Sequence, residues 1–192
     1  MKLGRKIRKI KTNILYFLKK TINSIIYDFI VFQLAKRKFL RSINAKKTIL
    51  SKSKKLDKIN KYEYKITSQN NEDGIINYLK KNITNPDHIF FEIGFDFNEF
   101  NSLNLIKDDW SGTLIDGDQI KCDKLKVCIK KYFKSQKVNI YNHFITYENI
   151  NEIIANSITK KNFDFFSLDT DGMDYWILEN LNYNPKIICA EF

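Results

Sequence analysis

The sequence predicts a doubly wound α/β domain, with helices on both faces of a mostly parallel sheet, preceded by a basic amphipathic N-terminal helix. The chain length, the alternation of apolar runs with helical segments and the distribution of charge lead to this fold class. The 192 residues are 43% hydrophobic, which suits one domain with an appendage and provides material for a core. With only 6 Gly and 2 Pro, collagen-like and turn-dense all-β folds are disfavoured.

Basic residues gather in the first third of the chain. Residues 1–61 contain 19 Lys and Arg against two acids, a net charge of +17, whereas the remainder carries −6. We therefore expect a basic helical leader and connector over residues 1–61 and an α/β domain over residues 62–192. Because the α/β domain is itself acidic, we do not expect nucleic acid as its partner.

Apolar side chains of the leader recur at steps of three or four, which places them on one side of a helix. They are Ile7, Ile10, Ile14, Leu18, Ile22, Ile25, Phe29 and Phe32. Lys19, Lys20 and Asp28 interrupt the apolar stretch, and each costs about 2.5–3.5 kcal/mol at the bilayer centre, which argues against a membrane span. The helix either packs on protein, meaning its own domain or a second subunit, or binds an anionic membrane surface.

The cysteines indicate the cellular compartment. Cys122, Cys128 and Cys189 form no CxxC pair, which disfavours a zinc module and a disulfide framework, and no signal-peptide cleavage site follows the leader. We therefore expect a cytoplasmic protein, peripheral at the inner face of the plasma membrane if the leader binds lipid.

From residue 88 onward, short apolar runs rich in β-branched and aromatic residues alternate with helical segments. The expected strands are residues 88–95, 112–117, 138–145, 163–169 and 186–192, and the expected helices are residues 99–109, 119–134, 149–157 and 173–181. Such alternation requires crossover connections, which give parallel strands covered on both faces.

Acidic residues follow most of the predicted strands. They are Glu92 and Asp96 around Gly94, then Asp116 and Asp118, then Asp169 and Asp171, and finally Glu191. Ligands of doubly wound sheets bind at the carboxyl ends of the strands, near the point where strand order reverses. We therefore expect these carboxylates to converge on one edge, although helix caps also collect Asp at such positions.

The spacing of Gly94 and Asp116 favours a nucleoside ligand. Gly94 allows a tight turn after the first strand, and Asp116 follows 22 residues later at the end of the second, where an acid accepts hydrogen bonds from ribose hydroxyls. Phe95 and Phe97 stand where a pyrophosphate would need small residues. An adenosine-type ligand without a pyrophosphate is therefore predicted.

At this point the sequence resembles the FkbM-type S-adenosylmethionine-dependent methyltransferases. Five blocks match the family in order: residues 68–74 (SQNNEDG), 91–94 with 101–102 (FEIG and NS), 110–118 (WSGTLIDGD), 145–150 (ITYENI) and 167–176 (SLDTDGMDYW). The resemblance covers residues 62–192. It implies a Rossmann-like methyltransferase domain, S-adenosylmethionine as cofactor, and a sugar or lipid-linked glycan as acceptor.

The matched blocks imply the cofactor-binding residues Glu92, Gly94, Asp96, Asn101, Asp116 and Gly117. Asp169, Asp171 and Asp174 form a DxDxxD set, in which Asp169 or Asp171 is the candidate base that removes the acceptor proton. Asp174 and Tyr175 are the candidate acceptor-binding residues. The acidic set suits Mg²⁺, but no metal ligand is assigned, and a helix N-cap with solvated neighbours is the alternative.

Two features differ from the family pattern. The glycine-rich stretch ExGxGDG is EIGFDFN at residues 92–98, so aromatic bulk is expected near the methionine end of the cofactor. The chain also ends at the fifth predicted strand, where the family continues through further strands, so we expect a sheet that lacks the last ones. A second function therefore stays open, a binding module of the same fold that has lost turnover.

Overall fold

A computed structural model describes residues 24–44, 58–97, 99–133, 137–158 and 162–191. The chain divides into two compact units, residues 1–38 and residues 39–192. Helix α2 extends over Ser24–Ile43, while residues 7–23 of the predicted amphipathic helix lie outside the described residues. Within the described part, no helix combines the length and apolar character needed to cross a membrane.

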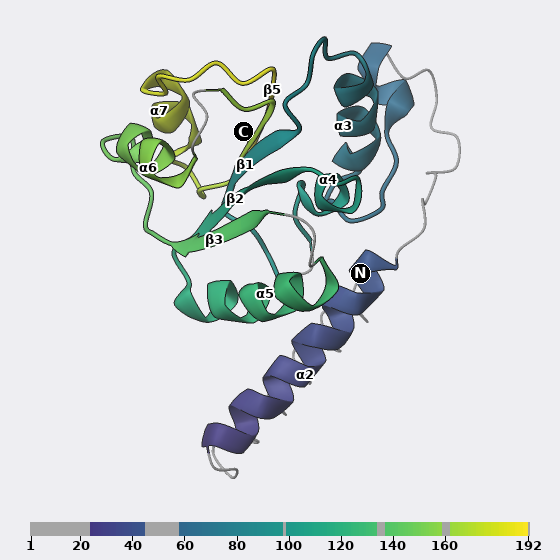
Figure 1. Cartoon of the computed structure of the whole chain (residues 1–192), viewed down its shortest axis with the longest axis vertical. Helices are drawn as coiled ribbons and strands as arrows, with labels where there is room; N and C mark the ends of the chain where they lie inside the picture. The colour runs from purple at the N-terminus through teal and green to yellow at the C-terminus, as the bar shows by residue number, and fades with distance from the viewer. Residues whose placement is uncertain (1–23, 45–57, 98, 134–136, 159–161, 192) are drawn as a thin grey trace, which may run out of the picture. The chain divides into compact units, whose positions relative to one another are not determined.

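The second unit contains a five-stranded parallel sheet with the strand order β3-β2-β1-β4-β5 (Figure 1). Its strands are β1 (Ile89–Ile93), β2 (Ser111–Asp116), β3 (Val138–Asn142), β4 (Phe165–Leu168) and β5 (Ile187–Ala190). All four strand pairs are parallel, which confirms the predicted fold class. Each predicted strand is present, and most are shorter at their ends than the apolar runs suggested.

The helices of this unit are α3 (Glu72–Lys81), α4 (Leu103–Lys107), α5 (Gln119–Tyr132), α6 (Ile150–Ser157) and α7 (Asp174–Glu179), with a short 3-10 helix η1 (Lys58–Tyr62). α4 is shorter than the predicted helix at residues 99–109 because Asp96 and Glu99 form an isolated bridge before it. The sequence analysis did not place α3.

Both faces of the sheet are buried. One face packs α6 and α7 against alternate strand residues, in a cluster that includes Phe91, Ile93, Phe166, Ile154 and Ile177. The intervening strand residues Phe90, Leu114 and Phe165 are also fully buried, so they face the opposite layer. Figure 1 shows α5 on that opposite side, beneath β2 and β3. Continuous apolar strands are the sequence pattern that this two-sided burial requires.

A loop before β1 is fixed by one buried carboxylate. Asp73, in the first turn of α3, accepts backbone hydrogen bonds from Ile66, Thr67 and Ser68, each at 2.7–2.8 Å. Both hydroxyl groups, of Thr67 and Ser68, also donate to it. At Gly74 a Cβ atom would lie 1.9 Å from the carbonyl oxygen of Tyr62, so no side chain fits there. These contacts hold residues 66–68 against the first turn of α3 and explain the Ser, Asp and Gly of the SQNNEDG block.

Candidate functional site

The candidate site lies where the strand order reverses. β1 pairs with β2 on one side and with β4 on the other, and the residues after these strands meet at the same edge of the sheet, here called the carboxyl edge. Gly94, directly after β1, has φ +73°, and a Cβ atom there would lie 1.8 Å from the carbonyl oxygen of Asp169. Only glycine allows this close approach of the two strand ends. The reversal is also where such sheets bind ligands.

A cavity of about 360 Å³, here called the main cavity, opens over the carboxyl ends of β1, β4 and β5. Its volume is in the range of small-molecule sites, roughly 300–1000 Å³. Six carboxylic acids line it: Glu72, Glu92, Asp96, Glu99, Asp169 and Glu191. Its other polar walls come from Gln69, Asn70, Asn101, Ser167 and Cys189. The main cavity therefore suits a ligand that carries positive charge.

Glu92 holds the wall of the main cavity together. Its carboxylate accepts hydrogen bonds from the backbone of Asn101 at 2.9 Å and from the backbone and hydroxyl of Ser102. The Asn101 amide in turn donates to the hydroxyl of Ser167 at 3.0 Å and to Cys189 Sγ at 3.4 Å. Burial raises the pKa of Glu92 to about 7, although its hydrogen bonds act in the opposite direction. One network thus connects β1, β4 and β5 beneath the cavity.

Asp169 faces other carboxylates. Oxygen atoms of Asp169, Asp171 and Glu191 all lie within 4.8 Å of one another, close enough to hold one hard cation. Burial, followed by a hydrogen bond with Glu191 and the charges of Glu191, Asp171 and Asp174, raises the pKa of Asp169 to about 6. A carboxylate with this pKa is mostly ionised at neutral pH and still accepts a proton, as a general base must.

Asp174 holds its own loop. It is buried, and its carboxylate accepts hydrogen bonds from Thr170 Oγ1 at 3.0 Å and from the backbone of Thr170 and Gly172. This supports the left-handed backbone at Asp171, which has φ +52°. Asp174 is the first residue of α7 and binds the preceding loop, whereas the N-cap of α7 is Met173 with no side-chain cap hydrogen bond, so the N-cap alternative is wrong for Asp174.

A second cavity, of about 440 Å³, is lined by Asp171, Gly172, Asp174, Tyr175 and Glu191. Glu191 lines both cavities. The Tyr175 side chain is 58% exposed and its hydroxyl lies 3.3 Å from Glu179 Oε1. The two cavities therefore meet at the acidic end of β5.

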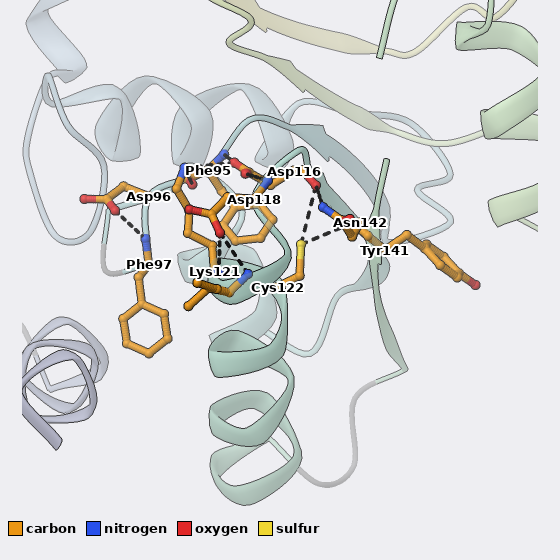
Figure 2. A network of polar contacts seen from close by, with 10 residues as sticks. Phe95, Asp96, Phe97, Asp116, Asp118, Lys121, Cys122, Tyr141 and Asn142 are labelled. Carbon is orange, nitrogen blue, oxygen red and sulfur yellow. Dashed lines mark hydrogen bonds and ion pairs between the residues drawn. The ribbon is translucent and has the colours of Figure 1, made fainter. Parts of the chain in front are cut away.

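The β2 end of the carboxyl edge is closed by internal contacts (Figure 2). Asp116 Oδ2 accepts hydrogen bonds from the backbone of Phe95 at 3.2 Å and from Lys121 Nζ at 3.0 Å, and Oδ1 accepts one from the backbone of Asp118 at 2.7 Å. Lys121 Nζ also donates to the carbonyl oxygen of Phe95 at 3.0 Å. Neither of the two cavities is lined by Asp116 or Gly117.

The two phenylalanines of the turn after β1, Phe95 and Phe97, lie in different places. Phe95 lines the main cavity and packs against Phe100, with ring centroids 6.0 Å apart. Phe97 is buried against Phe39 at 5.5 Å and does not line the main cavity. Of the two phenylalanines, only Phe95 therefore lines the main cavity, where the sequence predicted an aromatic side chain.

The structure brings Glu92, Gly94, Asp96, Asn101 and Asp169 together in one cavity and Asp171, Asp174 and Tyr175 in its neighbour. Six further cavity residues had no predicted site role, namely Gln69, Asn70, Glu72, Glu99, Ser167 and Cys189, whereas Glu191 was expected among the acids at this edge. Three of them belong to the SQNNEDG block, so that block was the signal that could have found them.

Comparison of the chain with models of protein families, with curated proteins and with solved structures gives no match. A functional assignment therefore depends on the geometry of the carboxyl edge and on the order of the sequence blocks.

Proposed function

We propose that this protein is an S-adenosylmethionine-dependent O-methyltransferase that acts on a hydroxyl of a sugar or glycan. The observation that carries the proposal is the hydrogen bond from the Phe95 backbone to Asp116 at 3.2 Å. It joins the glycine turn after β1 to the carboxylate after β2, the two elements that hold a nucleoside in doubly wound sheets. The five sequence blocks that resemble FkbM-type enzymes support the same interpretation.

Charge supports this choice of cofactor. S-adenosylmethionine carries a sulfonium and an ammonium group, and the main cavity beside the glycine turn has six acidic side chains in its walls. With the ribose at Asp116, the methionine end would extend from Gly94 toward Glu92 and Asp169. Attraction between opposite charges in a partly enclosed cavity is stronger than in water.

When bound, the cofactor supplies an electrophilic methyl group. Asp169 would accept the proton of the acceptor hydroxyl as the oxygen attacks that methyl group, and the pKa of about 6 fits this role. Glu92 and Asn101 would hold the cavity wall, since their hydrogen bonds connect three strands. Asp171 and Tyr175, in the second cavity, would contact the acceptor. The protein thus mainly positions the reacting groups.

The test is isothermal titration calorimetry with S-adenosylmethionine and S-adenosylhomocysteine. Wild-type protein should bind both, and Asp116→Asn should weaken binding about a hundredfold, because two hydrogen bonds to a charged group are lost. Asp123→Asn is the matched control, since Asp123 lies on α5 in an exposed ion pair with Lys126. No binding by wild-type protein, or equal binding by Asp116→Asn, would overturn the proposal.

A binding module without turnover is the second candidate, and the position of Phe95 in the wall of the main cavity favours it. Transfer of a labelled methyl group to glycan fractions separates the two functions. Cofactor binding with no transfer to any glycan fraction favours the module.

We also propose that residues 1–61, with their net charge of +17, hold the protein at an anionic membrane surface. Co-sedimentation with vesicles that contain phosphatidylglycerol tests this. Equal sedimentation with neutral phosphatidylcholine vesicles would contradict it.

A further inference from the structure

Lys121 occupies the position that ribose hydroxyls need. Its ammonium group donates to Asp116 Oδ2 and to the carbonyl oxygen of Phe95, both at 3.0 Å. Ribose hydroxyls are also donors, and Asp116 is the carboxylate that would receive them. Figure 2 shows Lys121 reaching from the first turn of α5 to both acceptors. The lysine therefore competes for the hydrogen bonds that a nucleoside would make.

The start of α5 places this lysine where it is. Asp118 caps the helix, because its Oδ1 accepts hydrogen bonds from the backbone of Ile120 at 2.8 Å and of Lys121 at 3.1 Å. A cation in the first turn of a helix is disfavoured by the helix dipole. The ion pair of Lys121 with Asp116 offsets this unfavourable interaction with the helix dipole. The first turn of α5 contains no acidic residue that could pair with Lys121 instead of Asp116.

Asp116 is more buried than Lys121, and its backbone is anchored. The carbonyl oxygen of Asp116 accepts hydrogen bonds from Asn142 Nδ2 at 2.9 Å and from Cys122 Sγ at 3.5 Å, which anchor its backbone. The Asp116 side chain is 9% exposed, whereas the Lys121 side chain is 37% exposed. When a ligand competes for Asp116, the lysine can move into solvent while the carboxylate stays in place.

We propose that Lys121 determines how tightly the nucleoside end of the cofactor binds, because its ammonium group must leave Asp116 before the ribose hydroxyls can reach it. This inference rests on the proposed function. It makes Lys121 a residue that selects for ligands with free 2′ and 3′ hydroxyls, since only these replace both of its hydrogen bonds.

Calorimetry of Lys121→Met with S-adenosylhomocysteine tests the inference, because methionine keeps the length of the side chain and removes the donor. The dissociation constant should fall about three- to tenfold, the range expected for removing a partly exposed competing ion pair. Lys126→Met is the matched control on the same helix, where the exposed pair with Asp123 lies away from the site, and its affinity should equal wild type.

A ligand pair makes the test specific to the hydroxyls. In ligand-observed NMR titrations, Lys121→Met should bind adenosine more tightly than wild type and 2′,3′-dideoxyadenosine with unchanged affinity. Equal strengthening for both nucleosides would overturn the inference, as would S-adenosylhomocysteine binding that Lys121→Met leaves unchanged or weakens. Those outcomes leave the proposed function intact. Absence of binding by wild type and by Lys121→Met would overturn both.

Discussion

Asp116 and Asp169 occupy equivalent positions on either side of β1 but have opposite surroundings. Each follows a parallel strand at the carboxyl edge. Asp116 accepts hydrogen bonds from a lysine and two backbone amides. Asp169 lies among Asp171, Asp174 and Glu191, and burial together with these acids raises its pKa to about 6. The position in the fold is shared, so the neighbours decide whether such a carboxylate pairs with a cation or lies among other acids.

The contrast has a simple electrostatic cause. Asp116 has an ion pair with Lys121, whereas desolvation and the neighbouring carboxylates favour the protonated form of Asp169. The turn at Gly94 lies between these two environments. The backbone amide of Phe95 donates to the Asp116 carboxylate, and Gly94 lies against the backbone carbonyl of Asp169.

Gly94→Ala should have the largest effect. A Cβ atom there would lie 1.8 Å from the Asp169 carbonyl oxygen, and φ is +73°, so the two strand ends must separate. We expect the free energy of unfolding to fall by about 3–5 kcal/mol, from left-handed backbone strain and overpacking together. Urea denaturation followed by circular dichroism measures this.

Gly172→Ala is the control for Gly94→Ala. Gly172 also has positive φ, +111°, but no atom lies within 4 Å of the position of a Cβ. Only backbone strain remains, and a loss of about 1–2 kcal/mol is expected. Equal losses for the two variants would mean that the close approach of β1 and β4 does not exist in solution.

Glu92→Gln should remove a pH dependence of stability. Because burial raises the pKa of Glu92 in the folded protein from 4.5 to about 7, the folded state binds the proton more tightly than the unfolded state in this range. Wild-type stability should therefore fall as pH rises from about 4.5 to about 7, by about 3 kcal/mol. Asp169 also titrates below about pH 6, so the variant, which cannot ionise at residue 92, should lose the slope in urea denaturation between pH 6 and 7.

Asp169→Asn separates the effect of Asp169 from that of the buried Glu92. The pKa of Asp169 is raised to about 6, so Asp169 stops contributing to the pH dependence of the free energy of unfolding near pH 6. The variant should keep the wild-type slope between pH 6 and 7. A wild-type slope that survives in Glu92→Gln would show that this carboxyl group is solvated in the folded protein.

Glu191→Gln should have the smallest effect, a shift in the titration of its neighbour. Glu191 raises the pKa of Asp169 through a hydrogen bond and through its charge, although burial contributes more. Removing the charge should lower the pKa of Asp169, and the acidic limb of the proposed methyl transfer should move by about 1 pH unit to lower pH. NMR titration of the Asp169 carboxyl carbon measures the same shift independently of activity.

The matched control is Glu179→Gln. Glu179 is an exposed acid that lies 3.3 Å from the hydroxyl of Tyr175 and does not contribute to the pKa of Asp169. Its removal should leave the profile unchanged. An Asp169 titration that is identical in wild type and Glu191→Gln would show that the two carboxyl groups do not interact.

The sequence predicted the sheet well because its signal is local. Each strand is a short apolar run followed by a helical segment, and burial on both faces requires this pattern. Helix α3 was missed because its start lacks the usual cap: the N-cap Asn71 has a left-handed backbone and makes no side-chain cap hydrogen bond. Asp73 there bonds to three backbone amides of the preceding loop, an arrangement that becomes visible only after folding.

The sequence by itself determined the fold class, the strand ends that carry acids and the glycine at the turn, because these follow from periodicity and from backbone stereochemistry. The tertiary structure alone decided which acids share a cavity and which pair with a lysine. Asp116 and Lys121 lie five residues apart, yet their contact depends on the cap of α5 and on the anchored end of β2. Distances between side chains on different elements are set by packing, and packing is a property of the whole domain.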